Sequence, residues 1–202
     1  ALEAIGPDAH EAVPQIAQQL AHPDSYVRMG ALLTLGAIGC PVGKREPDGV
    51  RSPSAHAASV IHPLATALQD DHKDISERAA EMLGVMGDLA APAVSAAARL
   101  LNDPSLSKRR AGVSLIERLG PHASMAATEL AMLHQESPGD PGYINALAAI
   151  GPAATAAVPA LMQYASREYP GTKQADSYYA LVLIQGNPMD LQNLIDLLRN
   201  DK

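Results

Sequence analysis

The sequence predicts an all-α fold, an α-solenoid in which antiparallel helical hairpins stack in chain order. Three observations support this prediction. Residues 12–39 carry two apolar stripes at helical spacing, glycines recur at hairpin-sized intervals, and the absence of Phe and Trp leaves a core of small and aliphatic side chains. Small side chains let helices approach closely, which suits stacked hairpins.

The first hairpin is defined by its two stripes. Its first helix is followed by a polar turn at residues 22–25, and its second helix is expected over residues 26–38. Gly39 is expected to supply the left-handed conformation on which helices often end. The stripe residues are Val13, Ile16 and Leu20 in the first helix and Val27, Ala31, Leu32, Leu35 and Ile38 in the second.

Helix-ending glycines recur along the chain at Gly6, Gly39, Gly87, Gly120, Gly151 and Gly186. The intervals are 33, 48, 33, 31 and 35 residues. Four intervals match helical-hairpin repeats, and the other matches one repeat plus an insertion of about 15 residues. We therefore expect a single solenoid over 1–202, with repeats at 7–39, 57–87, 88–120, 121–151 and 152–186, partial hairpins at 1–6 and 187–202, and an insertion loop at 40–56.

The repeats share a pattern: Ala-Val-Pro-x-Ile/Leu at 12–16 and 157–161, Val-Arg-x-x-Ala at 27–31, and Leu-Gly-x-Ile-Gly at 35–39. This pattern resembles HEAT repeats, particularly the bacterial HEAT-like type also found in phycobiliprotein lyases. The resemblance covers nearly the whole chain. It implies a superhelix whose second helices line the concave surface, and a role in binding more often than in catalysis. It also implies that Arg28 pairs with a turn aspartate of its own or an adjacent repeat, and Asp24 is the candidate.

The later repeats vary the pattern. Ser76 occupies the arginine position in the second repeat, whereas Arg109 aligns with Arg28 in the third. The fourth repeat has a shortened second helix, expected over 143–150. In the fifth, one of Tyr178 and Tyr179 is expected to enter the core, because adjacent helical positions point about 100° apart. A final helix over 189–198 either caps the array or continues it.

Two segments, residues 1–6 and the loop 40–56, depart from the repeat pattern. Residues 1–6 match the end of a second helix, so we expect a piece of a longer protein or a lost amino-terminal cap. The prolines and glycines of the 40–56 loop forbid regular structure. Loops of this length are often functional or disordered, and a functional loop would act as a ligand-contacting flap.

Composition limits the partner. A net charge of −7 and a pI near 5.4 argue against a nucleic-acid partner.

Cys40 is the single cysteine, so no internal disulfide can form. The chain holds no run of 18 apolar residues, and we expect no membrane insertion.

No catalytic constellation is found, so we expect a protein that is not an enzyme and has no cofactor or metal. Cys40 follows a helix end whose dipole disfavours a thiolate. No two histidines have metal-ligand spacing on one helix face. Deoxyhypusine hydroxylase, a HEAT-like enzyme, has repeated His-Glu dipeptides, and this chain has only His10-Glu11. HEAT-like DNA glycosylases need a basic, aromatic groove, which this composition does not provide.

The leading hypothesis is a scaffold that binds a protein or peptide through the groove of second helices and the 40–56 loop. Side-chain variety along the groove suits a partner with its own charge pattern. One alternative is a lyase-like or chaperone-like member that handles a bilin or its acceptor protein, and another is a structural spacer of a larger bacterial protein. The candidate contact residues are Met29, Leu33, Lys44, Arg45, Arg51, Glu77, Arg78, Glu81, Arg110, Ser114, Arg118, Asn145 and Tyr179.

Overall fold

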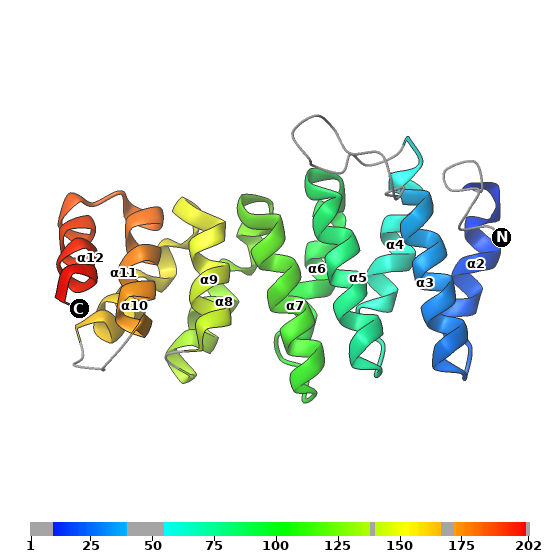
Figure 1. Ribbon diagram of the computed structural model, residues 1–202, viewed down its shortest axis with the longest axis horizontal. Coiled ribbons are helices and arrows are strands. Elements are labelled where there is room, and N and C mark those ends of the chain that lie inside the picture. Colours follow the sequence, from blue (N-terminus) through cyan, green and yellow to red (C-terminus); the bar gives the residue numbers. More distant parts are fainter. Residues whose placement is uncertain (1–9, 40–54, 138–139, 167–171, 201–202) are drawn as a thin grey trace. The chain divides into compact units, whose positions relative to one another are not determined.

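The computed structural model describes residues 10–39, 55–137, 140–166 and 172–200 (Figure 1). These ranges consist of α-helices, short 3-10 helices and turns, and no strand occurs within them. The predicted all-α fold of antiparallel hairpins is therefore confirmed. The chain divides into two compact units, Ala1–Leu115 and Ile116–Lys202. That all repeats form one continuous solenoid stays a prediction.

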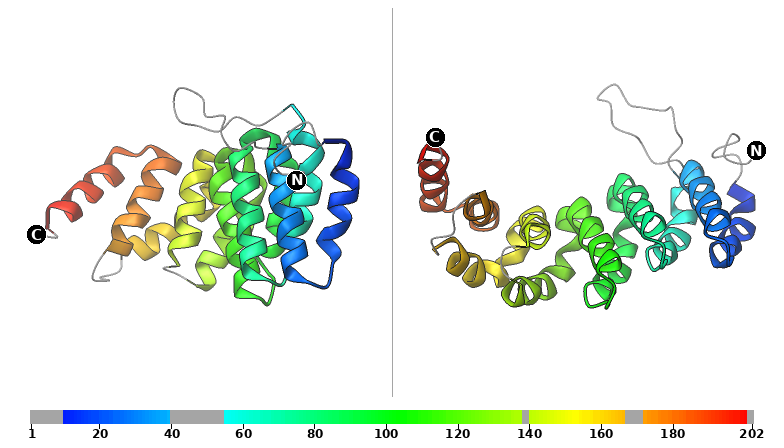
Figure 2. Two further views of the ribbon diagram at one scale, coloured as in Figure 1. Left: turned by 45° about the vertical axis from the view of Figure 1, so that its right-hand side comes forward. Right: turned by 60° about the horizontal axis from the view of Figure 1, so that its bottom comes forward.

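The described part of the first unit contains three hairpins. They are α2 (Val13–Gln18) and η2 (Gln19–Ala21) with α3 (Ser25–Gly39), α4 (Ala57–Ala67) with α5 (Lys73–Val85), and η3 (Gly87–Ala93) and α6 (Val94–Leu100) with α7 (Leu106–Leu119). The last residues of α7 belong to the second unit. Figures 1 and 2 show α3, α5 and α7 in one layer and α4 and α6 in the other.

The second unit continues the alternation of first and second helices. It contains η4 (Gly120–Ala126) and α8 (Ala127–Glu136) with α9 (Pro141–Ile150), η5 (Gly151–Ala157) and α10 (Val158–Ala165) with α11 (Thr172–Gln185), and α12 (Pro188–Asn200). The shortened second helix predicted in the fourth repeat is α9, which has 10 residues against 14 in α7. The 3-10 segments η3, η4 and η5 were not predicted.

Aliphatic side chains at the stripe positions form the core. Leu32, Leu35 and Ile38 of α3 are fully buried, as are Leu64 of α4 and Leu83 of α5. Full burial of one such side chain contributes roughly 1.5–3 kcal/mol. The apolar stripes therefore hold each hairpin together and hold it against its neighbours.

Four of the glycines predicted to end helices have a left-handed backbone. The φ angles are 53° at Gly87 and Gly120, 71° at Gly151 and 64° at Gly186. The prediction is wrong for Gly39, which is the buried last residue of α3 and has no positive φ. A Cβ at Gly39 would lie 2.6 Å from Val60 Cγ2, so close packing is the reason for glycine there.

The stretch Pro141–Ala165, formed by α9, η5 and α10, is long and apolar enough to cross a membrane by length and composition. Its mean hydropathy is 1.5. The stretch is not an unbroken run of 18 apolar residues, since Asn145, Thr155 and Gln163 interrupt it, and the expectation of no membrane insertion stays a prediction. Half of its most apolar window is buried inside the fold, and Gly151 breaks the helix with a φ of 71°. Packed core helices have the same properties.

Candidate interaction surfaces

Arg28 joins the turns of the first two hairpins. Its Nε donates to Asp70 Oδ2 at 2.6 Å and its Nη2 to Asp70 Oδ1 at 3.0 Å. Its Nη1 donates to the carbonyl oxygens of His22 and Pro23 at 2.9 and 3.0 Å. The hydrogen bond to Asp70 raises the pKa of Arg28. Burial acts to raise the pKa of Asp70, but hydrogen bonds from Arg28 and from the His72 backbone hold it below its usual value.

The predicted partner of Arg28, Asp24, has another role. Its Oδ1 accepts a hydrogen bond from the backbone N–H of Tyr26 at 2.8 Å, which closes its own turn. The side chains of Arg28 and Asp70 are 17% and 8% exposed, so little of the pair is offered to a ligand. Arg28 is therefore a structural link between the first two hairpins.

The third hairpin is attached to the second by a different residue. Arg109 aligns with Arg28 and makes the same contacts with its own turn. Its Nη1 donates to the carbonyl oxygens of Asp103 and Pro104 at 2.7 and 3.1 Å. The link to the second hairpin comes from Lys108, whose Nζ lies 2.6 Å from Asp71 Oδ1. That hydrogen bond raises the pKa of Lys108. The turns of the first unit thus form a charged ladder.

All of the predicted contact residues that the structure describes are at least partly exposed. Half-buried are Met29 and Leu33 on α3, Glu77 and Glu81 on α5, and Ser114 on α7; exposed are Arg78 on α5, Arg110 and Arg118 on α7, Asn145 on α9 and Tyr179 on α11. Tyr178 is half-buried beside the more exposed Tyr179. Lys44, Arg45 and Arg51 lie outside the described residues. Whether these positions contact a partner stays a prediction.

The second helices of the first unit present equivalent positions with different chemistry. Spacing between the helix-ending glycines places Leu33, Glu81 and Ser114 at one position of the repeat. A second position holds Met29 on α3 and Arg110 on α7. The exposed face formed by these positions, here called the second-helix face, changes from apolar on α3 to acidic on α5 and basic on α7.

Ion pairs engage Glu77 and Glu81 on α5, whereas Arg110 and Arg118 on α7 have none within the described residues. Arg78 Nη1 lies 2.7 Å from Glu81 Oε2, and Lys73 Nζ lies 3.7 Å from Glu77 Oε1. Within the described residues, no ion pair or hydrogen bond engages the side chains of Arg110 and Arg118. Arg110 is therefore a charge on this face that an external anion would meet, and Arg118 lies further along the same helix.

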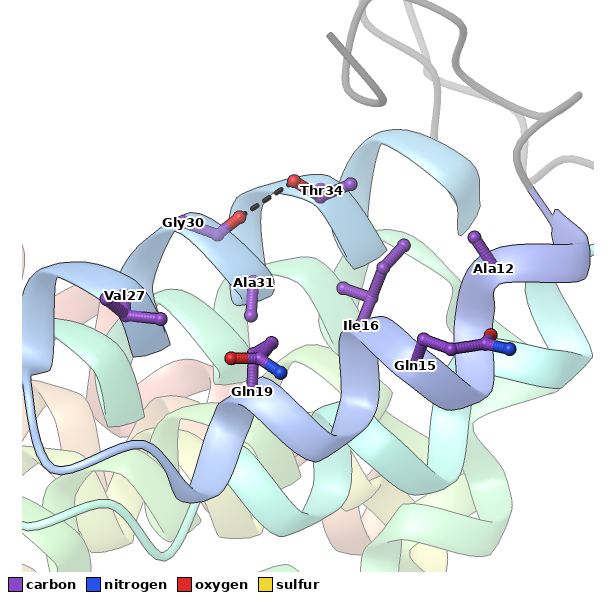
Figure 3. Close-up of a pocket in the computed structure, with 8 residues that line it drawn as sticks. All are labelled: Ala12, Gln15, Ile16, Gln19, Val27, Gly30, Ala31 and Thr34. Atoms are coloured by element: carbon purple, nitrogen blue, oxygen red, sulfur yellow. Dashed lines mark hydrogen bonds between the residues drawn. The ribbon is translucent and has the colours of Figure 1, made fainter.

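A second surface lies between α2 and α3, where a pocket of about 410 Å³ opens on the first hairpin (Figure 3). The lining residues are Ala12, Gln15, Ile16, Gln19, Val27, Gly30, Ala31 and Thr34. None of them is charged, and Thr34 Oγ1 is already used as a donor to the carbonyl oxygen of Gly30 at 2.8 Å. The sequence did not lead us to this surface. The feature that could have indicated it is the absence of charged residues over 12–23.

Histidines outside these surfaces have structural surroundings. His134 of α8 is fully buried, neither ring nitrogen has a hydrogen-bond partner among the described residues, and its ring meets Tyr164 edge-on at 5.9 Å. Burial lowers the pKa of His134, and Asp140 acts weakly in the opposite direction. The rings of His10 and His56 stack at 3.8 Å. In the described ranges, no group of three or more His, Cys, Asp or Glu side chains is placed to hold a metal ion.

No protein-family model matches the chain, and no curated protein matches it either. Solved structures do match. A designed armadillo repeat protein, YIII(Dq.V1)4CPAF in complex with the peptide (KR)4, is 19% identical, with a TM-score of 0.59 over 91% of this chain and 87% of the designed chain. Kap121p is 13% identical, with a TM-score of 0.59 over 92% of this chain and 21% of its own length.

These likenesses establish the fold. The chain is an armadillo/HEAT-type α-solenoid, as its repeat pattern predicted. It spans about a fifth of Kap121p. The bacterial and lyase-type features of the sequence resemblance stay predictions.

Proposed function

We propose that the chain is a non-catalytic scaffold that binds a protein or peptide segment on its second-helix face. The observation that carries the proposal is the order of side chains on that face. Apolar Met29 and Leu33 are followed by the internally paired acidic residues of α5 and then by Arg110 of α7, which has no partner in the described residues. A fixed order of this kind suits a segment with a matching order of side chains.

The unpaired cations indicate the polarity of that segment. The designed armadillo protein binds the basic peptide (KR)4, but here the carboxylates of Glu77 and Glu81 are engaged by Lys73 and Arg78. Arg110 and Arg118 remain available, and a guanidinium binds a carboxylate with two parallel hydrogen bonds. The bound segment therefore places acidic residues against α7 and apolar residues against α3.

A displayed library of random peptides tests this proposal with a defined probe. We expect the full chain to select peptides that combine acidic and apolar residues. Arg110→Glu with Arg118→Glu should weaken their binding by at least about tenfold, since attraction becomes repulsion. Arg99→Glu, an exposed site on the first helix α6, is the matched control and should bind as the wild type does.

Two outcomes would contradict the proposal. Equal affinity of the wild type and the α7 double variant for the selected peptides would show that the second-helix face does not bind them. Selection of no peptide at all would favour the spacer function. Circular dichroism must show that each variant keeps its helical content.

The insertion loop belongs to the same proposal. Its cations Lys44, Arg45 and Arg51 would add a second contact for an acidic segment beside the first two hairpins. A chain lacking residues 42–55 should then bind the selected peptides more weakly than the full chain. Unchanged affinity would show that the loop takes no part in binding.

A further inference from the structure

Two methionines of α5 pack over two glycines of α3. A Cβ placed on Gly36 would lie 2.5 Å from both Sδ and Cε of Met82. One placed on Gly39 would lie 2.5 Å from Cε of Met86. Real side chains do not approach this closely, so each methionine fills the space that a glycine leaves. We call these four residues the glycine-methionine contact.

The two methionines of this contact differ in exposure. Met86 is 2% exposed, whereas Met82 is half-buried. Solvent therefore reaches the side chain of Met82 but hardly that of Met86. The chain has seven methionines, and Met29 on α3 is half-buried as well. The others lie in the second unit and are more than half exposed: Met125, Met132, Met162 and Met189.

The thioether of Met82 can be oxidised. Hydrogen peroxide transfers one oxygen atom to a methionine sulfur: an S–O bond forms, the O–O bond breaks, the sulfur loses two electrons, and the peroxide leaves as water. The product, methionine sulfoxide, is a polar side chain in place of an apolar one, and sulfoxide reductases convert it back. A thioether packed between helices is therefore a reversible modification site wherever solvent reaches it.

The sulfoxide of Met82 does not fit the glycine-methionine contact. Its sulfur packs against Gly36, which has no side chain to donate a hydrogen bond, and the amide of Gly36 is used inside α3. A sulfoxide that stayed in place would bury an oxygen without a partner, which is costly. A sulfoxide that turned outward would leave Gly36 uncovered. In both cases α3 loses packing against α5.

We propose that Met82 is an oxidation site that controls the packing of α3 on α5. Arg28 and Asp70 tie the beginnings of these two helices together. The glycine-methionine contact lies toward their other ends. Oxidation of Met82 therefore loosens the ends of α3 and α5 while the ion pair holds their beginnings.

The loosening has a consequence for the second-helix face. Met29 and Leu33 of α3 supply its apolar part, and Glu81 of α5 supplies its acidic part. Their spacing changes when the ends of the two helices move apart, so oxidation would regulate binding on this face. This consequence rests on the proposed function. The oxidation site itself does not, because its test uses no peptide.

The test is a time course of the full chain with hydrogen peroxide, in which mass spectrometry of proteolytic fragments locates each sulfoxide. We expect the exposed methionines of the second unit to be oxidised first, Met82 next and Met86 last. The midpoint of thermal unfolding should fall by at least about 4 °C as Met82 is oxidised. Hydrogen exchange should become faster over residues 33–39 and 80–86 but not over 25–30. Treatment with sulfoxide reductases should restore both properties.

Matched variants isolate the effect of Met82. Met82→Leu keeps nearly the same volume and cannot be oxidised. Its exposed methionines should react as in the wild type, but its midpoint should not fall. Met132→Leu removes an exposed methionine instead, and its midpoint should fall as that of the wild type does.

Three results would overturn the proposal. One is a Met82 that stays reduced after the exposed methionines are fully oxidised. Another is an equal fall of the midpoint in Met82→Leu and the wild type. The third is unchanged hydrogen exchange at the ends of α3 and α5 once Met82 is oxidised. The first and third need no substitution, so they decide the matter even when Met82→Leu fails to fold.

Discussion

The two units stabilise similar hairpins with different chemistry. In the first unit, ion pairs join the turns of adjacent hairpins, with Arg28 on Asp70 and Lys108 on Asp71. In the second unit, a neutral and fully buried His134 packs edge-on against Tyr164. Each hairpin of a solenoid contacts only its neighbours. Different pairs of hairpins can therefore be held together by different side chains. The units should therefore respond differently to acid and salt.

The largest expected effect is the loss of folding stability when a buried leucine is shortened, and it should be the same in both units. Leu64→Ala in α4 and Leu147→Ala in α9 each remove a side chain that is 0% exposed. Each should cost about 2–5 kcal/mol, because a cavity remains between helices; Leu35→Ala should behave alike. Urea unfolding measures the loss, and hydrogen exchange should show faster opening in the altered unit. A negligible loss would mean that the buried stripes do not hold the hairpins.

Mild acid should distinguish the second unit. Burial lowers the pKa of His134, whereas an unfolded histidine titrates near about 6.5. The folded state therefore binds the proton less readily, and the stability of the second unit should fall as the pH drops below about 6.5. His134→Phe should remove this pH dependence. It should also stabilise the unit by about 1–3 kcal/mol, because two unsatisfied ring nitrogens are removed. Melting curves at pH 8 and 5.5 measure both effects, and a wild-type curve that does not shift would contradict them.

The smallest effect is expected at the charged ladder of the first unit. The pKa of Asp70 is held below its usual value, so the contribution of the Arg28 pair is complete above about pH 4 and is lost as the pH falls through the lower folded pKa. Asp70→Asn should destabilise the first unit slightly at pH 7 and reduce the dependence of its stability on salt. Asp24→Asn is the control. Equal salt dependence in both variants would show that the ladder contributes nothing.

Local rules explain why much of the fold could be predicted. The helices follow from apolar spacing, and Gly87, Gly120, Gly151 and Gly186 end helices as expected. The prediction for Gly39 was wrong because a glycine can serve packing as well as a left-handed turn, and only the contacts with Met86 and Val60 in the folded chain distinguish the two.

Long-range contacts explain what could not be predicted. A link between Arg28 and a turn aspartate was expected, but the partner is Asp70, 42 residues away and beyond the insertion. In the second repeat, Ser76 replaces the arginine and is buried, donating to the carbonyl oxygen of Lys73. The pocket on the first hairpin was missed, because apolar spacing shows which residues are covered but not by what.

The most direct test of the proposed scaffold function is hydrogen exchange of the full chain with and without a saturating peptide selected from the library. We expect slower exchange in the second helices α5 and α7 and unchanged exchange in the first helices α4 and α6. Slower exchange confined to α4 and α6 would contradict binding on the second-helix face.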